Sequence, residues 1–246
     1  MTAQPPAAAS LFPLGQDGIL ARFGDGYHAN PAAALAFGAA VRDAGLPGVT
    51  EVATSLASTL IRFAPPVIGR AELTTRLRAL LDAPREDAVA APTRLWTIPA
   101  SFGGDDGPQL EEAAVLAGVT VAQALETLTT TELSVLAIGF APGQPYLGHL
   151  PEAWDMPRQT GLTPQVPAGA LVVALRQIVL FANPSPTGWR RIGQCAFAPF
   201  RADRATPVAL RAGDRIRFAQ TDSGTIAGLR ANSPDGLGGA TLTEAS

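Results

Sequence analysis

Apolar and polar positions in the first part of the chain follow a pattern that predicts short strands separated by two helices. Runs over 18–23 and 49–63 alternate as strands do, and a turn divides the second run into two strands. Asn, Pro and Gly bound a helix over 30–45, and leucines on one face mark a second helix over 70–82. With a strand over 94–102, the order is β-α-β-β-α-β, which is typical of a ferredoxin-like, or split βαβ, domain.

The pattern changes in the second part of the chain. Two short helices are predicted over 107–118 and 120–128, and Thr120 with Gln123 can form a capping box at the start of the second. From Glu132 onward we find only strand and turn signals, with many short apolar runs separated by Gly and Pro. This spacing is typical of a barrel or sandwich of antiparallel strands.

Together these patterns predict an α+β protein with two domains. We expect the ferredoxin-like domain to occupy residues 1–88 and the β-barrel to occupy residues 89–222, with a linker before the strand at 94–102. We also expect the residues before 12 to be flexible. The tail over 223–246 is rich in small and polar residues, so we expect it to be mobile as well.

Composition restricts the classes of function. Hydrophobic residues make up 47% and charged residues 16% of the chain, which is typical of a globular protein with a substantial core. A net charge of -3 leaves no broad basic surface for nucleic acid or an anionic membrane. The apolar runs are shorter than the roughly 20 residues of a membrane-spanning helix, and no basic segment precedes an apolar one as in a signal peptide. We therefore expect a cytoplasmic protein with no nucleic-acid or membrane partner.

The residues needed for several common kinds of active site are missing. Cys195 is the only cysteine, so it cannot form an internal disulfide, and we interpret it as a small buried hydrophobe in a reducing compartment. His28 and His149 are not at metal-ligand spacing and no Cys-x-x-Cys occurs, so we expect no intrinsic metal site. The chain also lacks the P-loop, the dinucleotide-binding motif and the G-x-S-x-G elbow. These absences do not support a self-sufficient hydrolase of a common type.

Three loops rich in glycine and proline carry the remaining candidate chemistry. Each joins predicted strands and is stiffened by proline, so it can hold side chains in fixed positions without a large ordering cost on binding. Arg158 offers a planar fork for a carboxylate or phosphate, and Tyr146 and Trp189 offer apolar faces with a polar tip. The three loops are Gly139–Leu150, Met156–Gly169 and Asn183–Gly193.

The residues alone leave two interpretations of these loops open. In one, the loops meet at one end of the barrel and form one cleft, with Phe140 anchored in the core and Tyr146 and Arg158 facing the cleft. In the other, Phe140, Tyr146 and Trp189 only close the end of the barrel, and Arg158 is a solvated surface charge.

The sequences of the loops resemble the KipI / PxpB family, which includes the B subunit of 5-oxoprolinase and proteins called allophanate hydrolase subunit 1. The stretches GFAPGQPYLGHLP, MPRQTGLTPQVPAG and SPTGWRRIG occur in the family's order, whose pattern runs GF-x-PGF-x-YLG, PR, a second PR, VPAGS, QTGIYP and SPGGW-x-(L/I)IG. The stretches GQDGILARFGD and LRAGDRIRF resemble its opening and its closing PGDRVRF, so the resemblance covers nearly the whole chain. It implies an N-terminal ferredoxin-like domain followed by a cyclophilin-like antiparallel β-barrel.

The resemblance also implies candidate site residues. Several positions depart from the family. Gln144 replaces the second Phe of PGF, Leu162-Thr163 replaces the second PR, and Leu128 stands where the family usually has a His. Ala170 replaces the Ser of VPAGS, IVLFA follows Gln177 in place of TGIYP, and Thr187 replaces the first Gly of SPGGW. No general base can be named. The substrate-binding candidates are Arg158, Tyr146, Gln177, Trp189 and Gln144, and the loop scaffold consists of Gly139, Phe140, Pro142, Gly143, Pro167, Gly169 and Gly188.

As a function, the resemblance implies one subunit of an ATP-dependent 5-oxoprolinase, which opens the cyclic amide of 5-oxo-L-proline to L-glutamate. ATP with Mg would act at the level of the complex, because this chain has no phosphate-binding motif of its own. The implied partners are a homologous KipA / PxpC-type subunit and a large third subunit, which act together on a small-molecule substrate. The chain alone is expected to be inactive.

The same resemblance leaves other functions open. One is a non-catalytic regulatory binding protein, like the KipI inhibitor of a histidine kinase, and the missing His and second Arg fit that role. Another is a component of a biotin-dependent urea carboxylase or allophanate hydrolase system. A prolyl isomerase rests only on the likeness of the barrel to cyclophilin, and a fold does not carry a function. A neighbouring gene for the partner subunit would favour the enzyme, and a neighbouring kinase gene would favour the inhibitor.

Overall fold

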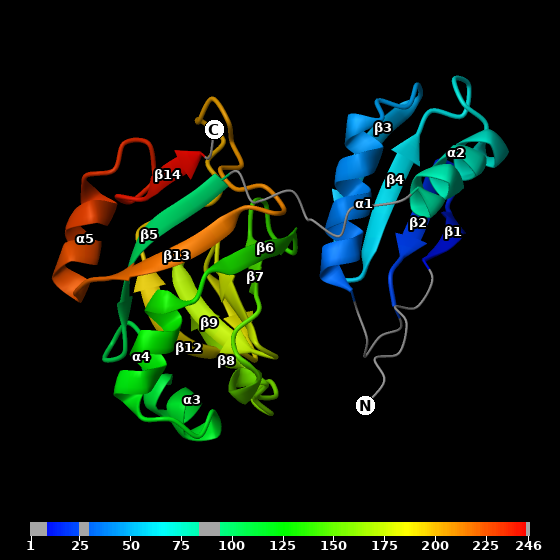
Figure 1. Ribbon diagram of the computed structural model, residues 1–246. Coiled ribbons are helices and arrows are strands. Elements are labelled where there is room, and N and C mark those ends of the chain that lie inside the picture. Colours follow the sequence, from blue (N-terminus) through cyan, green and yellow to red (C-terminus); the bar gives the residue numbers. More distant parts are fainter. Residues whose placement is uncertain (1–8, 25–29, 84–93, 245–246) are drawn as a thin grey trace. The chain divides into compact units, whose positions relative to one another are not determined.

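The chain divides into two units, Met1–Ala91 and Pro92–Ser246 (Figure 1). The structure is a computed structural model that describes residues 9–24, 30–83 and 94–244. The predicted boundary after residue 88 lies outside the described residues. One unit is an antiparallel sheet with helices and the other is a closed barrel, so the predicted α+β class is confirmed.

The first unit is a four-stranded antiparallel sheet packed against two helices, with strand order β1-β2-β4-β3. Asn30 begins the first helix as predicted, because its side-chain oxygen accepts a hydrogen bond from the Ala33 N–H at 3.0 Å. Apolar side chains of β2, β4 and both helices form the core of this unit, among them Ile61, Phe37 and Leu73. The elements are β1 Ser10–Leu14, β2 Gly18–Arg22, α1 Pro31–Asp43, β3 Val49–Thr54, β4 Ser58–Phe63 and α2 Arg70–Asp82.

The fourth strand of this sheet differs from the prediction. The strand predicted over 94–102 belongs to the barrel, and β1 takes the place beside β2. Pro13 hid this strand in the sequence pattern, because proline lacks the N–H that a central strand needs, but the edge of a sheet tolerates it. Gly15, at a φ of 61°, turns the chain from β1 into β2. The expected flexibility before residue 12 is therefore wrong for the start of β1.

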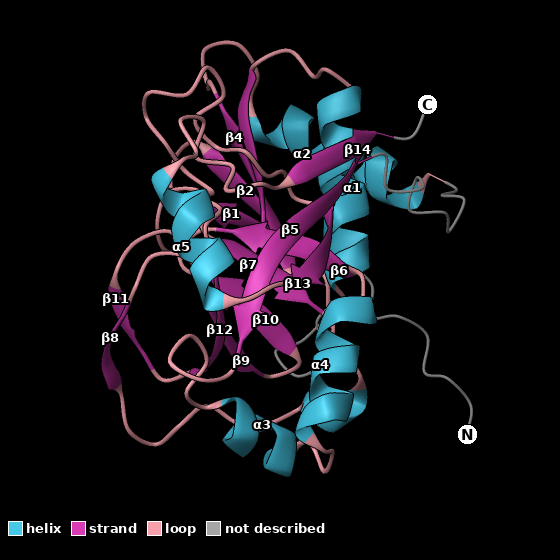
Figure 2. Cartoon of the chain, turned by 90° about the vertical axis from the view of Figure 1, so that its left-hand side faces the viewer, coloured by secondary structure: helices cyan, strands magenta, loops and turns pink. Residues whose placement is uncertain are grey.

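The second unit is a closed 7-strand barrel, as the sequence predicted. Its strands follow the order β12-β9-β10-β7-β6-β13-β5, and the pairing of β12 with β5 closes it. Most neighbours are antiparallel, but β13 and β5 run parallel. A separate two-stranded ribbon, β8 with β11, stands outside the barrel wall (Figure 2). The elements are β5 Arg94–Phe102, β6 Leu133–Ile138, β7 Pro145–Gly148, β8 Thr163–Val166, β9 Ala170–Ala174, β10 Gln177–Leu180, β11 Ser185–Thr187, β12 Arg190–Cys195 and β13 Arg215–Gln220, with the 3-10 turn Glu152–Trp154 after β7.

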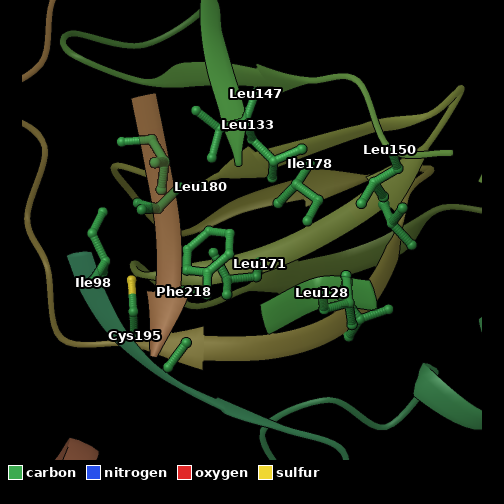
Figure 3. Packing of buried hydrophobic residues seen from close by; sticks show 14 of the residues in the cluster. Ile98, Leu128, Leu133, Leu147, Leu150, Leu171, Ile178, Leu180, Cys195 and Phe218 are labelled. Carbon is green, nitrogen blue, oxygen red and sulfur yellow. The ribbon is translucent and has the colours of Figure 1, made fainter. Parts of the chain in front are cut away.

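Both helices predicted between the strand at 94–102 and the later strands are present, as α3 Leu110–Leu116 and α4 Val121–Thr130. The capping box is confirmed, because the Thr120 hydroxyl accepts from the Gln123 N–H at 3.2 Å and the Gln123 side chain accepts from the Thr120 N–H at 2.9 Å. Leu128 of α4 is fully buried in the barrel core (Figure 3), so an apolar contact occupies the position where the resembled family usually has a His. Within the described residues no single helix is long and apolar enough to cross a membrane, and α3 with α4 reaches that length and composition only across a bend of 93°.

Strands β9 and β10 are buried on both faces. Leu171 and Ile178 point into the barrel core (Figure 3). Because side chains alternate along a strand, Val172 and Val179 point outward, and they belong to a separate apolar cluster. Cys195 lies in the barrel core, where burial raises the pKa of its thiol to about 12. The thiol therefore stays protonated near neutral pH, which confirms its interpretation as a small buried hydrophobe.

The tail that was expected to be mobile contains a helix and a strand, α5 Ser223–Ala231 and β14 Thr241–Glu244. Asp222 caps the helix by accepting from the Thr225 N–H at 2.8 Å, and Ile226 is only 2% exposed. Strand β14 pairs antiparallel with β5. The prediction was wrong because long-range contacts, among them the burial of Ile226 and the pairing of β14 with β5, hold a segment whose composition is otherwise that of a loop.

Replacing Ile226 by alanine tests whether this tail stabilises the second unit. We expect Ile226→Ala to lower the free energy of unfolding by about 2–5 kcal/mol, the usual range for a buried large-to-small substitution. Leu242→Ala is the control, because Leu242 is 37% exposed and should change stability by less than about 1 kcal/mol. The measurement is urea unfolding of the full chain, and equal midpoints for Ile226→Ala and wild type would contradict an ordered tail.

Candidate functional site

The candidate site lies on the outer face of the barrel wall. Tyr146 of β7 is opposite Val179 of β10, which is opposite Val172 of β9. Trp189, just after the β8–β11 ribbon, packs in one apolar cluster with these valines, and Tyr146 lies at its margin. The barrel core is a different cluster on the other side of the same strands. The sequence analysis placed the site at one end of the barrel, whereas the structure places these side chains on its side.

Three of the predicted binding residues come together here. The rings of Tyr146 and Trp189 are 6.4 Å apart between centroids and inclined at 77°, an edge-to-face arrangement. The guanidinium carbon of Arg158 lies 5.5 Å from the centre of the Trp189 ring, within cation–π range. Trp189 is only 7% exposed, whereas Arg158 is exposed. A buried ring therefore supports an arginine whose planar fork can meet a carboxylate or phosphate from solvent.

The two predicted glutamines have different positions. Gln177 is half-buried at the start of β10, and its place two residues before Val179 puts it on the outer face of the wall. Gln144 is 1% exposed, and its side-chain oxygen accepts from the Ala182 N–H at 3.3 Å. Its backbone carbonyl accepts from the Gly139 N–H at 2.9 Å. Gln144 therefore ties the β6–β7 loop to the segment after β10. Gln177 is the glutamine that shares the outer face of the wall with the aromatic pair.

Two glycines of the predicted loop scaffold are required by the backbone. Gly143 has a φ of 70°, and a Cβ there would lie 2.9 Å from the Pro199 carbonyl oxygen. Gly169 has a φ of 79°, and a Cβ there would overlap the Cys195 carbonyl oxygen. The remaining scaffold positions are less constrained: Gly139 and Gly188 have room for a Cβ, Pro142 is exposed and Pro167 is half-buried.

Phe140 does not have the role that the sequence analysis predicted. Its side chain is 76% exposed, so it does not anchor the loop in the core. Its φ is 71°, in the left-handed region that bulky residues rarely adopt. The Gln144 N–H donates to the Ala141 carbonyl at 3.1 Å, which closes the turn that follows Phe140. The loop thus turns the ring outward.

A buried arginine holds the residue before Arg158. Arg190 is 7% exposed, and its Nη1 donates to the Pro157 carbonyl at 2.7 Å. Its Nε donates to the Glu112 carboxylate on α3, also at 2.7 Å. Because a buried guanidinium needs partners for its N–H groups, these two bonds fix Arg190 and through it the backbone at Pro157.

A second set of hydrogen bonds holds the residue after Arg158. The Gln159 N–H donates to the Gly188 carbonyl at 2.7 Å, and its side-chain Nε2 donates to the Trp189 carbonyl at 3.0 Å. Its Oε1 accepts from Gln109 at 2.6 Å, and Gln109 in turn accepts from the Arg191 N–H at 2.8 Å. The backbone on both sides of Arg158 is therefore fixed relative to the Trp189 ring.

No motif in the sequence indicates this network. Gln109 and Gln159 are 50 positions apart, and Glu112 and Arg190 are 78 positions apart, so no local pattern relates them. Arg190 lies inside a recognised motif, but at the position where the family pattern allows any residue. The supporting role of Arg190 follows from its burial, and burial is visible only once the fold is known.

Histidine and metal-binding side chains are the next groups to consider near the wall. Partial burial, and secondly the charge of Arg176, lower the pKa of His149, so its exposed imidazole is neutral at pH 7. His28 lies outside the described residues. Within the described part of the chain, no group of three or more His, Cys, Asp or Glu side chains is arranged to hold a metal ion.

Comparison with known families and proteins gives consistent matches. Residues 9–210 match the family described as carboxyltransferase domain, subdomain C and D. The B subunit of 5-oxoprolinase from Bacillus subtilis (strain 168) is 35% identical over 127 residues, which are 52% of this chain and 53% of that protein. The protein of the same name from Escherichia coli O157:H7 is 35% identical over 138 residues, or 56% of this chain and 63% of that protein. The chain thus spans a little more than half the length of these curated relatives.

Solved structures with a similar fold include proteins larger than this chain. TTHA0988 has a TM-score of 0.68 at 31% identity, covering 83% of this chain and 40% of that chain. The uncharacterized protein PH0987 from Pyrococcus horikoshii has a TM-score of 0.52 at 25% identity, covering 88% of this chain and 100% of that chain. The Kluyveromyces lactis urea carboxylase has a TM-score of 0.71 and covers 96% of this chain and 24% of that chain, but at 14% identity it shows the fold alone.

Substitution of the two neighbouring arginines tests their different roles. We expect Arg190→Leu to lower the free energy of unfolding by about 1–3 kcal/mol, because it leaves the Pro157 carbonyl and Glu112 without their partner. We expect Arg158→Leu to change stability by less than about 1 kcal/mol, because an exposed arginine over a ring contributes little. Urea unfolding of both variants measures the difference. Equal losses in the two variants would contradict the assignment of Arg190 as the buried support.

Proposed function

The chain belongs to the carboxyltransferase-domain family, subdomain C and D, and on that premise we propose that it is one subunit of a 5-oxoprolinase-type complex. The reaction we propose for the complex is the ATP-dependent opening of 5-oxo-L-proline to L-glutamate in the cytoplasm. The names of the curated relatives, which call them B subunits of 5-oxoprolinase, support this proposal.

The observation that carries the proposal is the exposed Arg158 held on the buried Trp189 ring. The proposed substrate is a small ring that bears one carboxylate. The planar fork of Arg158 can bind that carboxylate in a bidentate way. The half-buried Tyr146 ring and the amide of Gln177 lie on the same wall and suit the ring and its polar edge, while the buried Trp189 holds Arg158 in place.

The fixed backbone around Arg158 would contribute to catalysis by positioning. A substrate held by its carboxylate in one orientation presents its ring amide in a constant place, which lowers the entropic part of the barrier. Ring amides are poor electrophiles, and the chemistry that ATP supplies is activation of the amide oxygen by phosphorylation. Within the described residues no group of three or more His, Cys, Asp or Glu side chains is arranged to hold a metal, and the sequence has no P-loop to bind the phosphates of ATP. We therefore assign phosphoryl transfer to other subunits.

The partners we propose are a homologous KipA / PxpC-type subunit and a large third subunit. The word subunit in the names of the curated relatives supports a multi-subunit assembly. This chain covers 40% of TTHA0988, so that protein contains a further portion besides the matched fold. This supports a partner polypeptide for the chain.

A second candidate function is favoured by one position. Leu162, which stands where the resembled family has its second PR, is 72% exposed. An exposed leucine, next to Thr163 where the family has the arginine of this PR, suits contact with a protein better than contact with a charged substrate. The alternative is therefore a regulatory binding protein of the KipI type, which acts by contact with a kinase.

The first functional prediction concerns the isolated chain and the complex. We expect the purified chain alone to hydrolyse neither ATP nor 5-oxoproline. After co-expression with the KipA / PxpC-type and large subunits, we expect glutamate formation that requires both ATP and 5-oxoproline. The measurement is glutamate release and ADP release in parallel. A complete complex that forms but releases no glutamate would contradict the proposed reaction and favour the regulatory alternative.

The second functional prediction concerns Arg158. We expect Arg158→Gln in the assembled complex to lower kcat/KM for 5-oxoproline about 10- to 100-fold, mainly through KM, because a charge-assisted pair contributes about 1.5–3 kcal/mol. The control is Arg22→Gln, which removes an exposed arginine on β2 and should leave kcat/KM unchanged. An unchanged KM in Arg158→Gln would show that Arg158 does not bind the substrate carboxylate.

A further inference from the structure

Phe140 combines two features that are unfavourable for the isolated chain. Three quarters of its side chain is exposed, at 76%, so burial of the ring contributes little to the fold. Its backbone is left-handed at a φ of 71°, a conformation that is strained for an aromatic residue but open to glycine. An isolated chain would be served as well or better by glycine at this position.

The loop that carries Phe140 is held in one shape. Gly139 donates to the Gln144 carbonyl at 2.9 Å, and the buried Gln144 side chain accepts from the Ala182 N–H at 3.3 Å. On the far side of the loop, Gly143 lies so close to Pro199 and Phe200 that a Cβ would come within 2.9 Å of them. The ring is therefore presented by a rigid support, and binding through it requires little ordering of the loop.

Residues in strained conformations persist where the surrounding structure holds them, and they gather at sites of function. Aromatic residues, phenylalanine among them, are enriched at protein–protein interfaces relative to the rest of the surface. We propose that Phe140 is the anchor of a protein–protein interface, and that its ring inserts into an apolar pocket of the homologous partner subunit. The identity of that partner rests on the proposed function.

A protein partner fits this ring better than a small ligand. A side chain that exposes 76% of its surface projects from the β6–β7 loop, and a binding site for a small molecule needs walls on several sides. The following residue, Ala141, is half-buried and Pro142 is exposed, so the tip of the loop is largely apolar. A projecting apolar tip is complementary to a concave pocket on another protein.

The test is Phe140→Gly, because the proposal predicts opposite effects on the fold and on the contact. In the isolated chain we expect Tm to stay within about two degrees of wild type or to rise, since strain is relieved and no buried contact is lost. We expect the dissociation constant for the KipA / PxpC-type subunit to rise at least tenfold, the usual effect of removing an anchor residue. Size exclusion and calorimetric titration of the two purified subunits measure the complex.

Two matched variants control for strain and for exposure. Leu175→Gly replaces another exposed apolar residue with positive φ, 53°, at the β9–β10 turn. Val115→Ser removes an apolar side chain that is 77% exposed on α3. We expect both variants to bind the partner with the affinity of wild type. If either weakens binding as much as Phe140→Gly, a general change in the surface explains the loss and the proposal is wrong.

The remaining outcomes separate this proposal from the proposed function. If wild type binds the partner and Phe140→Gly binds equally well, the anchor is wrong while the complex stands. If wild type does not bind the partner, both proposals are wrong. A fall in Tm of more than about five degrees in Phe140→Gly would show that the ring stabilises the fold itself, and would also overturn the proposal.

Discussion

Strand β9 has no face that meets solvent, since all five of its residues are buried. Leu171 and Val173 contribute to the barrel core, and Val172 and Ala174 contribute to the outer cluster. The outer face of this wall must therefore be covered, because apolar side chains left in water would lose roughly 25 cal/mol per Å² of burial. Trp189 provides part of that cover, and its ring also supports Arg158. The requirement to cover one strand thus places the candidate binding group.

The two arginines of the candidate site differ in burial, and so in the role that each can have. Arg190 is buried and bonded to Glu112 and to the carbonyl of Pro157, so its N–H groups serve the fold. Arg158 is exposed and stacks on a ring, so its charge stays hydrated until a ligand arrives. A long exposed side chain normally loses much rotamer freedom on binding, but an arginine already stacked on a fixed ring loses less. Pre-organisation of this kind raises affinity without adding a contact.

The sequence was a good guide to local structure and a poor guide to long-range placement. Capping signals at Asn30 and Thr120 predicted helix starts correctly, because these bonds join residues three positions apart. β1 was missed because Pro13 breaks its pattern. The tail was missed because Ile226 is the only large hydrophobic side chain that is fully buried in its described part. The loops rich in glycine and proline pointed to Arg158, Tyr146 and Trp189, and the structure brings these side chains together. Whether these side chains lie inside or outside the barrel depends on how its strands close on one another. No local sequence pattern encodes that closure.

The arrangement of charge around Arg158 bears on what the wall can hold. Arg191 donates to Gln194 at 3.0 Å and lies 3.7 Å from Asp106, so its guanidinium is engaged elsewhere. At the position of the family's second PR, Leu162 lies close to Gly188, where a Cβ would be 3.7 Å away, and so borders the same rim without a charge.

A planar fork binds one carboxylate in a bidentate way through two parallel N–H donors. A ligand with one carboxylate and an apolar ring matches a rim of one exposed guanidinium beside two aromatic rings. A phosphorylated form of the same ligand carries a second anionic group, for which neither the engaged Arg191 nor the uncharged Leu162 offers a second fork. That group would have to be bound by donors from outside this wall. On the proposed function, we infer from this charge pattern that this chain holds the carboxylate end of the substrate and that another subunit binds the phosphoryl group.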